Sequence, residues 1–536
     1  MFVRAIILIF GLFLSTGSAV AGCPEIGAPP RTITSPAKDY ANSGNFSLDE
    51  DGILIYDYGE AYGKLGKYHN PYFISNYAGA LYRDYLNASC EDAGVESSFL
   101  KQARWLLRSG VRRGNTLVWT YEFPNERFDL KSGWISGIGQ ARIAGILQRA
   151  YALTADVAFH EAAEAAMEVY RVPLKDGGVV TLDEDATWIE EAPHPGGISF
   201  KILNGHITAL AGIRDFFQIT KEAEWKEVFD RGVRAVERDI SKFDAGFSSN
   251  YSLAIAVGRL TAPPDGYNAL HVDQLLWLYD ETSKPIFLEW ASRFRAFQTV
   301  GDKYSAKGSV DPIHHGPDQA AGFYGSKYWS HSDFPTWLRV DMPESEEIAR
   351  FELDSNGLKA SPRDFTLSAL TREGWREVYS VKGNEKDTLS IIFEKPILAS
   401  AFRIDIESDN GNRNTAIQAA MPVRANPHYA PVANFCNWRT GNMEQAEDGN
   451  PETAMKVFCP GFIIVPMETY SRLAISASAA PGERFKIESS SDLTDWTNVQ
   501  WLDAARTPGV VHVGGRYARI SFDAGVTGIN ELSRME

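Results

Sequence analysis

The sequence predicts a multidomain protein in which an α/α toroid of about four helical hairpins is followed by two β-sandwich domains. Three observations predict this order. Apolar residues recur at helical spacing from about residue 70 to 300, alternation and turns follow after about residue 305, and each half contains a weak internal repeat. The chain has 536 residues, 44% hydrophobic and 23% charged, which is a globular composition. We expect a signal peptide at 1–21 and domains at 22–304, 305–426 and 427–536.

The first residues have the pattern of a secretory signal peptide. A short basic start, Met1 to Arg4, precedes an apolar run that is too short to span a bilayer comfortably, and Ala19-Val20-Ala21 offers a cleavage site. No later stretch is long and apolar enough for a transmembrane helix. The protein is therefore expected to be exported, either periplasmic or secreted. An alternative cut exists because Val20-Ala21-Gly22-Cys23 resembles a bacterial lipobox, which would place a lipid on Cys23.

The four cysteines predict two disulfides, because an even number in an exported chain favours pairing. By proximity in the sequence we pair Cys436 with Cys459 and Cys23 with Cys90. Lipidation of Cys23 would instead leave Cys90 without a partner.

The helical half is organised by a repeat in which an aromatic residue follows a threonine five positions later. We expect each threonine to cap the N-terminus of the second helix of a hairpin, with the aromatic residue packing one turn in. An earlier hairpin is expected from helices near 73–86 and 98–110. The repeat consists of Thr154 with Phe159, Thr220 with Trp225, and Thr282 with Phe287.

Links within these hairpins are short, whereas the links between hairpins, near 111–133, 172–202 and 241–268, are long. In an alternating ring of hairpins all the long links emerge at one end. Long ordered loops on a rigid scaffold are where functional sites are usually built. The long links are therefore the places to look for a site.

Each long link carries chemically useful side chains. The second link places two adjacent carboxylates, Glu190 and Glu191, in a Pro-containing segment that can also be read as a solvated turn. The first link is rich in aromatic residues, including Trp119 and Tyr121, and an aromatic surface suits stacking on sugar rings. The third link leads to tyrosines, which in loops are more often packing residues with a hydrogen-bonded tip.

The strand half also contains a repeat. Phe365 precedes Trp375 by ten residues and Phe485 precedes Trp496 by eleven, and Ala-Phe-Arg-Ile ending at Ile404 resembles Tyr-Ala-Arg-Ile ending at 520. Two related β-sandwiches divided near residue 427 explain this pattern.

The net charge of the chain limits the classes of molecule that it is expected to bind. The chain has 53 basic and 69 acidic residues and a net charge of −16, which argues against a nucleic-acid binder. Lys101, Arg104, Arg108 and Arg112 are spaced to share one face of a helix, either as an ordinary solvated face or as a rail for an acidic polysaccharide. The histidines lack metal-ligand spacing, so neither a metal nor a cofactor is expected.

The helical half resembles the C-terminal catalytic domain of the D-glucuronyl C5-epimerases, from about Asn70 to Phe297. The resemblance implies an α/α toroid and the epimerisation of uronates within a polysaccharide. The matching stretches are Asn70-Pro71, Gly133-Trp134-Ile135-Ser136, Arg149-Ala150-Tyr151-Ala152-Leu153-Thr154, Trp188-Ile189-Glu190-Glu191, Leu203-Asn204-Gly205-His206, Asp244-Ala245-Gly246 with Tyr251, and Tyr267 followed by His271-Val272-Asp273-Gln274-Leu275.

The resemblance also implies residue roles. Glu191 matches the acidic catalytic residue, Tyr267 a tyrosine assigned to proton exchange, and Tyr251 another active-site tyrosine. The family has a tyrosine where this chain has Ala192 and an arginine where it has Ala254. Seven residues are expected to contact the substrate. Two are aromatic residues of the first link, Trp119 and Tyr121, and two belong to the matched stretches, Glu190 and Asn204. The other three are the nearest cations in the sequence that could replace the arginine: His194, Lys201 and Arg259.

The strand half resembles the factor 5/8 type C, or discoidin, domain. The match is moderate over about 430–525, through Ala446 to Thr453 and Ser490-Ser491-Asp492, and weaker over 310–425. The resemblance implies β-sandwiches that often bind glycans. Some relatives bind calcium, which this sequence does not decide, and a structural spacer is the alternative.

Inverting carbon 5 of a hexuronate requires removing a proton next to a carboxylate, so acid and base groups must stand on opposite faces of the ring. The substrate carboxylate must also be neutralised. We therefore expect an enzyme that epimerises D-glucuronate to L-iduronate in a heparosan-like or other uronate-containing glycan, with Glu191 and Tyr267 as the acid–base pair. The alternatives are a polysaccharide lyase or hydrolase on the same scaffold, and a non-catalytic glycan-binding protein.

Overall fold

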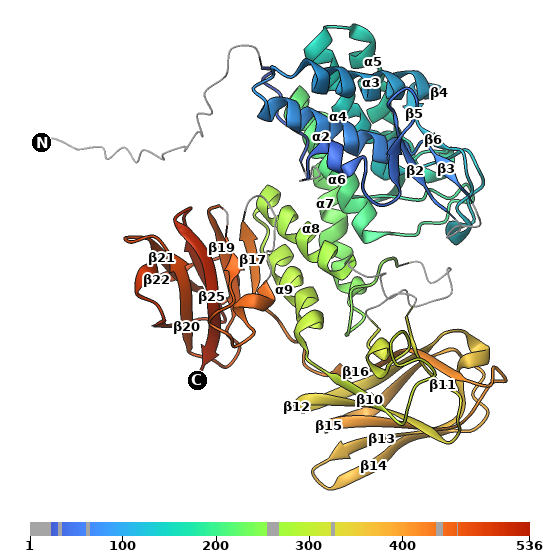
Figure 1. The fold of residues 1–536 in the computed structure, drawn as a ribbon, viewed down its shortest axis with the longest axis vertical. Coiled ribbons are helices and arrows are strands. Elements are labelled where there is room, and N and C mark those ends of the chain that lie inside the picture. The colour runs from blue at the N-terminus through green and yellow to red at the C-terminus, as the bar shows by residue number, and fades with distance from the viewer. Residues whose placement is uncertain are drawn as a thin grey trace, which may run out of the picture. The chain divides into compact units, whose positions relative to one another are not determined.

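The computed structural model describes residues 23–30, 35–59, 65–253, 267–322, 327–435, 443–457 and 459–536. These residues form a helical region followed by β-sheet domains, as the sequence predicts (Figure 1). The chain divides into two compact units. One comprises Met1–Asp183, Thr187–Ser199 and Thr208–Asp230, and the other comprises Glu184–Ala186, Phe200–Ile207 and Arg231–Glu536.

The first unit begins with a short helix and a small antiparallel sheet, and then forms the first helical hairpin. The small elements are α1 (Ala37–Tyr40), β1 (Phe46–Leu48), β2 (Leu54–Asp57) and β3 (Lys67–Tyr68). Helix α2 (Pro71–Asn87) starts where the Asn70 side chain accepts a hydrogen bond from the Phe73 N–H. Helix α3 (Ala93–Ser109) starts where Asp92 accepts from the N–H groups of residues 94 and 95. Helix α2 packs against both α3 and α4.

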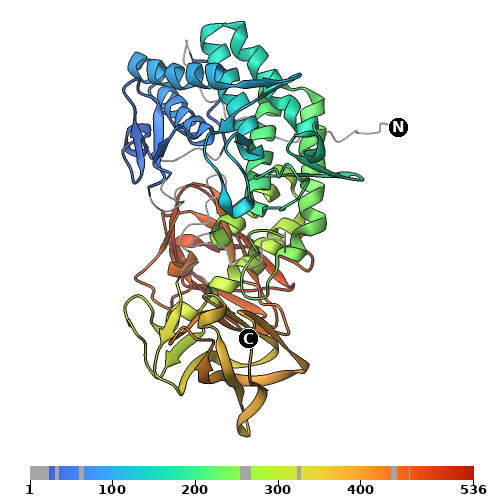
Figure 2. The same cartoon turned by 90° about the vertical axis from the view of Figure 1, so that its right-hand side faces the viewer.

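In the described part of the chain, six further long helices continue the pattern of paired helices (Figure 2). Helix α4 packs against α5, and α8 packs against α9. Phe216 and Trp225, from α6 and α7, meet edge to face with ring centroids 6.0 Å apart. The helices are α4 (Gly137–Thr154), α5 (Val157–Met167), α6 (Leu203–Thr220), α7 (Ala223–Asp239), α8 (Tyr267–Thr282) and α9 (Pro285–Thr299).

The threonine repeat is structural, but the expected role of the threonines as N-caps is wrong. Thr154 is the last residue of the first helix of its hairpin, and its hydroxyl donates to the Ala150 carbonyl at 2.8 Å. The N-cap of α5 is instead Asp156, whose backbone N–H donates to the threonine hydroxyl at 3.2 Å. Thr220 and Thr282 make the same pair of bonds. A left-handed residue follows each threonine and turns the chain: Ala155, Lys221 and Ser283.

The links between hairpins contain short strands and turns. The first link holds β4 (Val111–Arg113), β5 (Thr116–Val118), β6 (Thr120–Tyr121) and β7 (Trp134–Ile135), with β4 paired to β5 and β6 to β7. The second holds β8 (Val180–Asp183) and β9 (Ala186–Ile189), which form a two-stranded sheet. Small paired strands satisfy backbone groups in long connections, so these links are ordered rather than loose.

The N-terminal described segment is fastened to the helices. Cys23 forms a disulfide with Cys90, which confirms one of the two predicted pairs. Because the disulfide uses the Cys23 sulfur, it is incompatible with the alternative of a lipid on that atom. Cys436, in the other predicted pair, lies outside the described residues. Within the described ranges, no helix has the length and apolar character needed to cross a membrane.

The strands from Lys303 to Arg424 form one seven-stranded sheet around a single apolar core. Two very long strands, β12 and β15, pair along most of their length, with register shifts in the middle. Such bulges let long strands bend, so that one continuous sheet can enclose a core. The strands are β10 (Lys303–Ala306), β11 (Trp329–His331), β12 (Thr336–Ser355), β13 (Pro362–Thr371), β14 (Gly374–Val381), β15 (Thr388–Asp409) and β16 (Thr415–Arg424).

The remaining strands form a five-stranded sheet in the order β17-β19-β24-β21-β22 and a four-stranded sheet in the order β18-β25-β20-β23. Both sheets contribute to one core. The strands are β17 (Val432–Phe435), β18 (Met455–Lys456), β19 (Gly461–Pro466), β20 (Arg472–Ala479), β21 (Arg484–Ser490), β22 (Thr497–Asp503), β23 (Gly509–His512), β24 (Tyr517–Phe522) and β25 (Val526–Met535).

The repeat of the strand half reappears as a matched contact. In the first β-module, which comprises strands β10 to β16, the Arg403 guanidinium lies over the Trp375 ring at 5.2 Å. In the second, Arg519 lies over Trp496 at 4.3 Å. Each arginine belongs to the repeated strand motif, and each tryptophan follows the repeated phenylalanine. The two modules therefore place corresponding residues in corresponding contacts, with a cation on an aromatic face in both.

The turn at residues 244–247 is fixed against the first β-module. Arg350 of β12 donates to the Ala245 carbonyl at 2.8 Å. Gly246 has φ +85°, and a Cβ on it would lie 2.4 Å from Val423 of β16. Ala245 and Phe247 join an apolar cluster with residues of β16. Only glycine fits this close approach, so the turn and the module pack as one body.

Candidate functional site

The two adjacent carboxylates of the second link have different environments. Glu190 is fully buried, and its carboxylate accepts hydrogen bonds from the hydroxyls of Thr181 and Ser199, at 3.1 Å and 2.5 Å. Its backbone N–H donates to the Val179 carbonyl at 2.8 Å. Glu190 is therefore built into the protein interior, which favours a structural role over the expected contact with substrate.

Glu191 is only partly buried, and its backbone is held in place. Its carbonyl accepts a hydrogen bond from the Ser136 hydroxyl at 2.7 Å. The same serine lies beside the phenol of Tyr121, whose pKa it lowers. Burial, then the neighbouring phenols Tyr58 and Tyr72, then the charge of Glu191 raise the pKa of Tyr121 well above its usual value. Ser136 thus holds the backbone of Glu191, and the phenol of Tyr121 stays protonated near the Glu191 charge.

Gly137, the first residue of α4, makes the close contact that seats this carboxylate segment. Its N–H donates to the Glu190 carbonyl at 3.1 Å. A Cβ at this position would lie 2.4 Å from the same carbonyl oxygen and 2.9 Å from the Ile189 side chain. The strand end that carries Glu190 and Glu191 can approach the helix only because residue 137 lacks a side chain.

We predict that Gly137→Ala lowers the free energy of unfolding by about 1–3 kcal/mol, because the added methyl group must displace the Glu190 backbone. The measurement is the midpoint of chemical unfolding of the full chain. Gly139→Ala is the matched control on the same helix, since the nearest atoms to a Cβ there are 3.7 Å away. Equal midpoints for the two variants would contradict the proposed close contact.

The aromatic residues of the first link do not form the expected surface for sugar stacking. Trp119 is 1% exposed, and its indole N–H donates to the Leu106 carbonyl at 2.8 Å, so it belongs to the core. Tyr121 is 4% exposed and its ring stacks on Trp134, with centroids 4.1 Å apart. Burial of large aromatic area stabilises the link, which is the opposite of presenting open ring faces.

The two tyrosines assigned to proton exchange meet. Tyr251, 4% exposed, and Tyr267, the first residue of α8, have ring centroids 5.1 Å apart at an interplanar angle of 90°. The Tyr251 carbonyl accepts a hydrogen bond from the Leu203 N–H at 3.1 Å, which ties this segment to the start of α6. These tyrosines belong to one compact unit and Glu191 belongs to the other.

A buried polar cluster lies behind Tyr267. The Ser249 hydroxyl is 2.8 Å from the Asn268 amide oxygen and 2.7 Å from His271 Nδ1. Burial lowers the pKa of His271 to about 3, so the imidazole is neutral at physiological pH. The Asn268 amide donates to the Phe294 carbonyl of α9 at 2.8 Å. This cluster fixes the first turn of α8, on which Tyr267 stands.

Lys201 is held in a cluster of three cations around one buried carboxylate. Its ammonium is 2.8 Å from Asp239, which also pairs with Arg238 at 3.1 Å and Lys242 at 2.7 Å. Burial opposes ionisation, but hydrogen bonds from the three cations hold the pKa of Asp239 well below its usual range. Lys201 is therefore committed to an ion pair, although the cluster as a whole carries more positive than negative groups.

The remaining expected contacts are placed as follows. His194 is partly buried, and its Nδ1 accepts a hydrogen bond from the Gly196 N–H at 3.0 Å. Asn204 is 9% exposed, and its backbone carbonyl accepts a hydrogen bond from the Gln274 side-chain amide at 2.9 Å. Arg259 and Ala254 lie outside the described residues. Among the described residues, no group of three acidic, histidine or cysteine side chains is arranged to hold a metal ion.

The basic stripe is shorter than expected. Lys101, Arg104 and Arg108 are exposed on α3, but the helix ends at Ser109 and Arg112 belongs to strand β4. The helix is followed by Gly110 in an extended conformation, and a Cβ there would lie 2.9 Å from Leu117 of strand β5. Three of the four cations therefore share one helix face, and the fourth lies on the adjacent hairpin.

Comparison with known protein families finds matches to the helical segment and to part of the strand half. Residues 113–296 match the family of the D-glucuronyl C5-epimerase C-terminus. This C5-epimerase-like segment includes Glu191, Tyr251 and Tyr267, so the resemblance seen in the sequence is confirmed. Residues 303–420 match the family of the F5/8 type C domain. That match falls on the first β-module, which we had ranked as the weaker of the two copies.

Two curated relatives share the C5-epimerase-like region. The uncharacterized protein MJ1128 of Methanocaldococcus jannaschii is 24% identical over 315 residues, which cover 55% of this chain and 96% of that protein. The D-glucuronyl C5-epimerase of Caenorhabditis elegans is 28% identical over 214 residues, covering 37% of this chain. The matched region spans 34% of that epimerase's length.

Solved structures of carbohydrate-binding modules match part of the chain. One of them is the family 32 module of C. perfringens NanJ in complex with galactose, at 15% identity and a TM-score of 0.21. The match covers 22% of this chain and 90% of the module.

Sequence reasoning missed the residues that support the site. Ser136 and Gly137 anchor the Glu190–Glu191 segment, and Ser249 and Asn268 orient His271. A signal for Ser136 was present, because it ends the matched Gly-Trp-Ile-Ser stretch. The supporting role of Gly137 depends on a contact between residues far apart in the chain, which no local pattern contains.

Proposed function

We propose that the protein is an exported polysaccharide-modifying enzyme that inverts carbon 5 of a hexuronate, converting D-glucuronate to L-iduronate in a heparosan-like glycan. The observation that carries the proposal is the meeting of Tyr251 and Tyr267, with ring centroids 5.1 Å apart, inside the segment that matches the C5-epimerase family. In this proposal the helical hairpins form an α/α toroid, which brings Glu191 to the same sugar ring as the tyrosines.

The proposed reaction needs a proton to leave carbon 5 on one face and another to arrive on the opposite face. Glu191 and Tyr267 take these two roles, and Tyr251 supports or relays. A tyrosine phenol has a pKa of about 10, so it suits the acid role unless a cation lowers its pKa. The backbone bridge between Ile202 and Ser252 places Lys201 beside the segment that carries Tyr251, and we assign the cation cluster at Lys201 the neutralisation of the substrate carboxylate.

The test is incubation with heparosan and other polyuronates in deuterated water. Epimerisation predicts deuterium at carbon 5 and iduronate in the product, with no change in chain length. Unsaturated, ultraviolet-absorbing products would instead identify a lyase, and shortened saturated chains a hydrolase. Binding of polysaccharide with no deuterium entry for any substrate would leave a glycan-binding protein and overturn the enzymatic proposal.

We further propose that the exposed cations of α3 guide an acidic polysaccharide. None of Lys101, Arg104 and Arg108 has a carboxylate partner in the described part of the chain. We predict that Arg104→Ala with Arg108→Ala weakens binding to a polyuronate about three- to thirtyfold at low ionic strength, because each exposed cation contributes up to ~1 kcal/mol. The difference should vanish at high salt, where the charges are screened.

The control for that prediction is Lys175→Ala with Lys221→Ala, which removes the same charge from exposed positions outside the α3 face. Binding would be followed by retention on an immobilised polyuronate at several salt concentrations. Equal retention of the two double variants would assign the effect to net charge and reject a defined face.

A further inference from the structure

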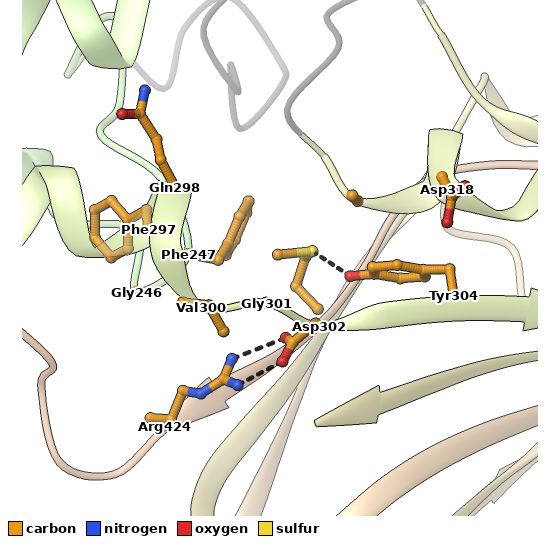
Figure 3. Close-up of a pocket in the computed structure, with 12 residues that line it drawn as sticks. Gly246, Phe247, Phe297, Gln298, Val300, Gly301, Asp302, Tyr304, Asp318 and Arg424 are labelled. Atoms are coloured by element: carbon orange, nitrogen blue, oxygen red, sulfur yellow. Dashed lines mark hydrogen bonds and ion pairs between the residues drawn. The ribbon is translucent and has the colours of Figure 1, made fainter. Parts of the chain in front are cut away.

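A cavity of 290 Å³ lies within the second compact unit, and its lining does not include Tyr251 or Tyr267 (Figure 3). It is bounded by the end of α9, the fixed turn at residues 244–247, strand β10 and the end of β16. Its volume is at the lower end of ligand-sized pockets, about 300–1,000 Å³, and therefore suits one monosaccharide rather than a longer chain.

The guanidinium at the floor of the cavity has no donor left for an anionic ligand. Arg424 donates to both oxygens of Asp302, at 2.9 Å and 2.6 Å, as Figure 3 shows. Its remaining N–H groups go to Glu346, at 3.1–3.3 Å, and to the Pro422 carbonyl at 3.4 Å. A carboxylate or sulfate entering the cavity would thus meet no available cation among the described lining residues.

Two carboxylates face the cavity instead. Asp302 lies at the floor with its side chain 7% exposed, and Asp318 is an exposed residue of the wall. Both act on the phenol of Tyr304. Burial is the largest cause that raises the pKa of Tyr304 well above its usual value, and the charge of Asp302 is the next. The charge of Asp318 also raises this pKa, whereas Arg424 lowers it. The lining thus carries an excess of negative charge, which attracts a cation.

The upper walls are apolar and aromatic. Phe247 and Tyr304 flank the space above the Asp302–Arg424 pair in Figure 3. The Tyr304 hydroxyl is used by the Ala420 carbonyl at 3.2 Å and the Met421 sulfur at 3.0 Å, so this residue offers its ring rather than its polar tip. Aromatic faces bind both the C–H face of a sugar and a cation.

We propose that this cavity binds one sugar residue with an unsubstituted amino group, its ammonium directed to Asp302 and Asp318 and its ring against Phe247 and Tyr304. A uronate is excluded because the carboxylates repel it and Arg424 is saturated. An N-acetylated sugar lacks the positive charge that the site selects. The site is separate from the proposed epimerase chemistry and does not depend on it.

The test is direct binding of monosaccharides to the full chain at neutral pH by calorimetry or ligand-observed NMR. Glucosamine is expected to bind at least tenfold more tightly than N-acetylglucosamine, glucose or glucuronate. Asp318→Asn should remove most of this preference, and Met421→Trp should abolish binding by filling the cavity. Asp333→Asn, an exposed acid of the same module that does not line the cavity, is the matched control and should bind as the parent does.

Several results would overturn the proposal. Glucuronate or N-acetylglucosamine binding as tightly as glucosamine would reject the charge selection. Propylamine binding as tightly as glucosamine would reduce the cavity to a simple cation site. An unchanged preference in Asp318→Asn would also reject it, and that variant alters an exposed side chain, so loss of folding would not obscure the result. Deuterium exchange on polyuronates measures the epimerase proposal independently.

Discussion

Glu191→Gln is expected to reduce deuterium entry at carbon 5 of a polyuronate by about 10²–10⁴-fold, the usual contribution of a positioned acid or base. The amide is almost the same size as the carboxylate, and residue 191 is held through its backbone carbonyl by the Ser136 hydroxyl at 2.7 Å. The substitution therefore leaves the anchor intact and removes only the titratable group. Exchange would be followed by NMR at saturating substrate.

The matched control is Glu122→Gln, which alters an exposed carboxylate of the first link. It should leave exchange unchanged, and both variants should unfold at the same denaturant concentration as the parent. Exchange by Glu191→Gln at the parent rate would remove this residue from the mechanism. Loss of exchange in both variants would show that a general effect of charge, rather than Glu191, is being measured.

Arg149→Ala is expected to cost about 3–5 kcal/mol of stability, the largest loss we predict for a single residue. Arg149 and Asp215 are 1% and 4% exposed and joined by two hydrogen bonds of 2.8 Å and 2.9 Å, which connect α4 to α6. Removing the guanidinium leaves a buried carboxylate without its charge partner. It also frees the Gly27 carbonyl, which Arg149 Nε binds at 2.8 Å.

The measurement is the urea midpoint of the helical circular dichroism signal of the full chain. The double variant Arg149→Met with Asp215→Leu is the informative control, because replacing a buried ion pair with apolar residues is often close to neutral. A double variant as unstable as Arg149→Ala would show that packing, not charge, accounts for the loss. A single variant within ~1 kcal/mol of the parent would contradict the prediction itself.

Much of the fold could be predicted because its signals are local. The threonine–aromatic repeat located three helical hairpins, although the threonines end the first helix instead of starting the second. The error has a simple cause, since a hydroxyl can either accept from a helix N-terminus or donate to the carbonyl four residues earlier. The repeat in the strand half was also real, and its arginine and tryptophan meet in both modules.

The candidate site could be predicted only in part. The family resemblance proposed Glu191, Tyr251 and Tyr267 as candidates, but the sequence could not separate Glu190, which is buried and hydrogen-bonded, from its neighbour. It also took Trp119 for a surface residue, because the sequence of a link does not reveal which rings pack beneath it. Burial and close approach depend on contacts between distant residues, and these were visible only in the folded chain.

The fixed turn at residues 244–247 sets a limit on how the chain can be dissected. Arg350 and Val423 of the first β-module hold Ala245 and Gly246, and Tyr251 follows a few residues later. A truncation placed after α9, where the helical half ends, would strip that support from the tyrosine loop. The smallest fragment worth expressing for enzymology therefore extends through β16. The first β-module holds the turn that leads to Tyr251, so it cannot be removed without affecting the tyrosine loop.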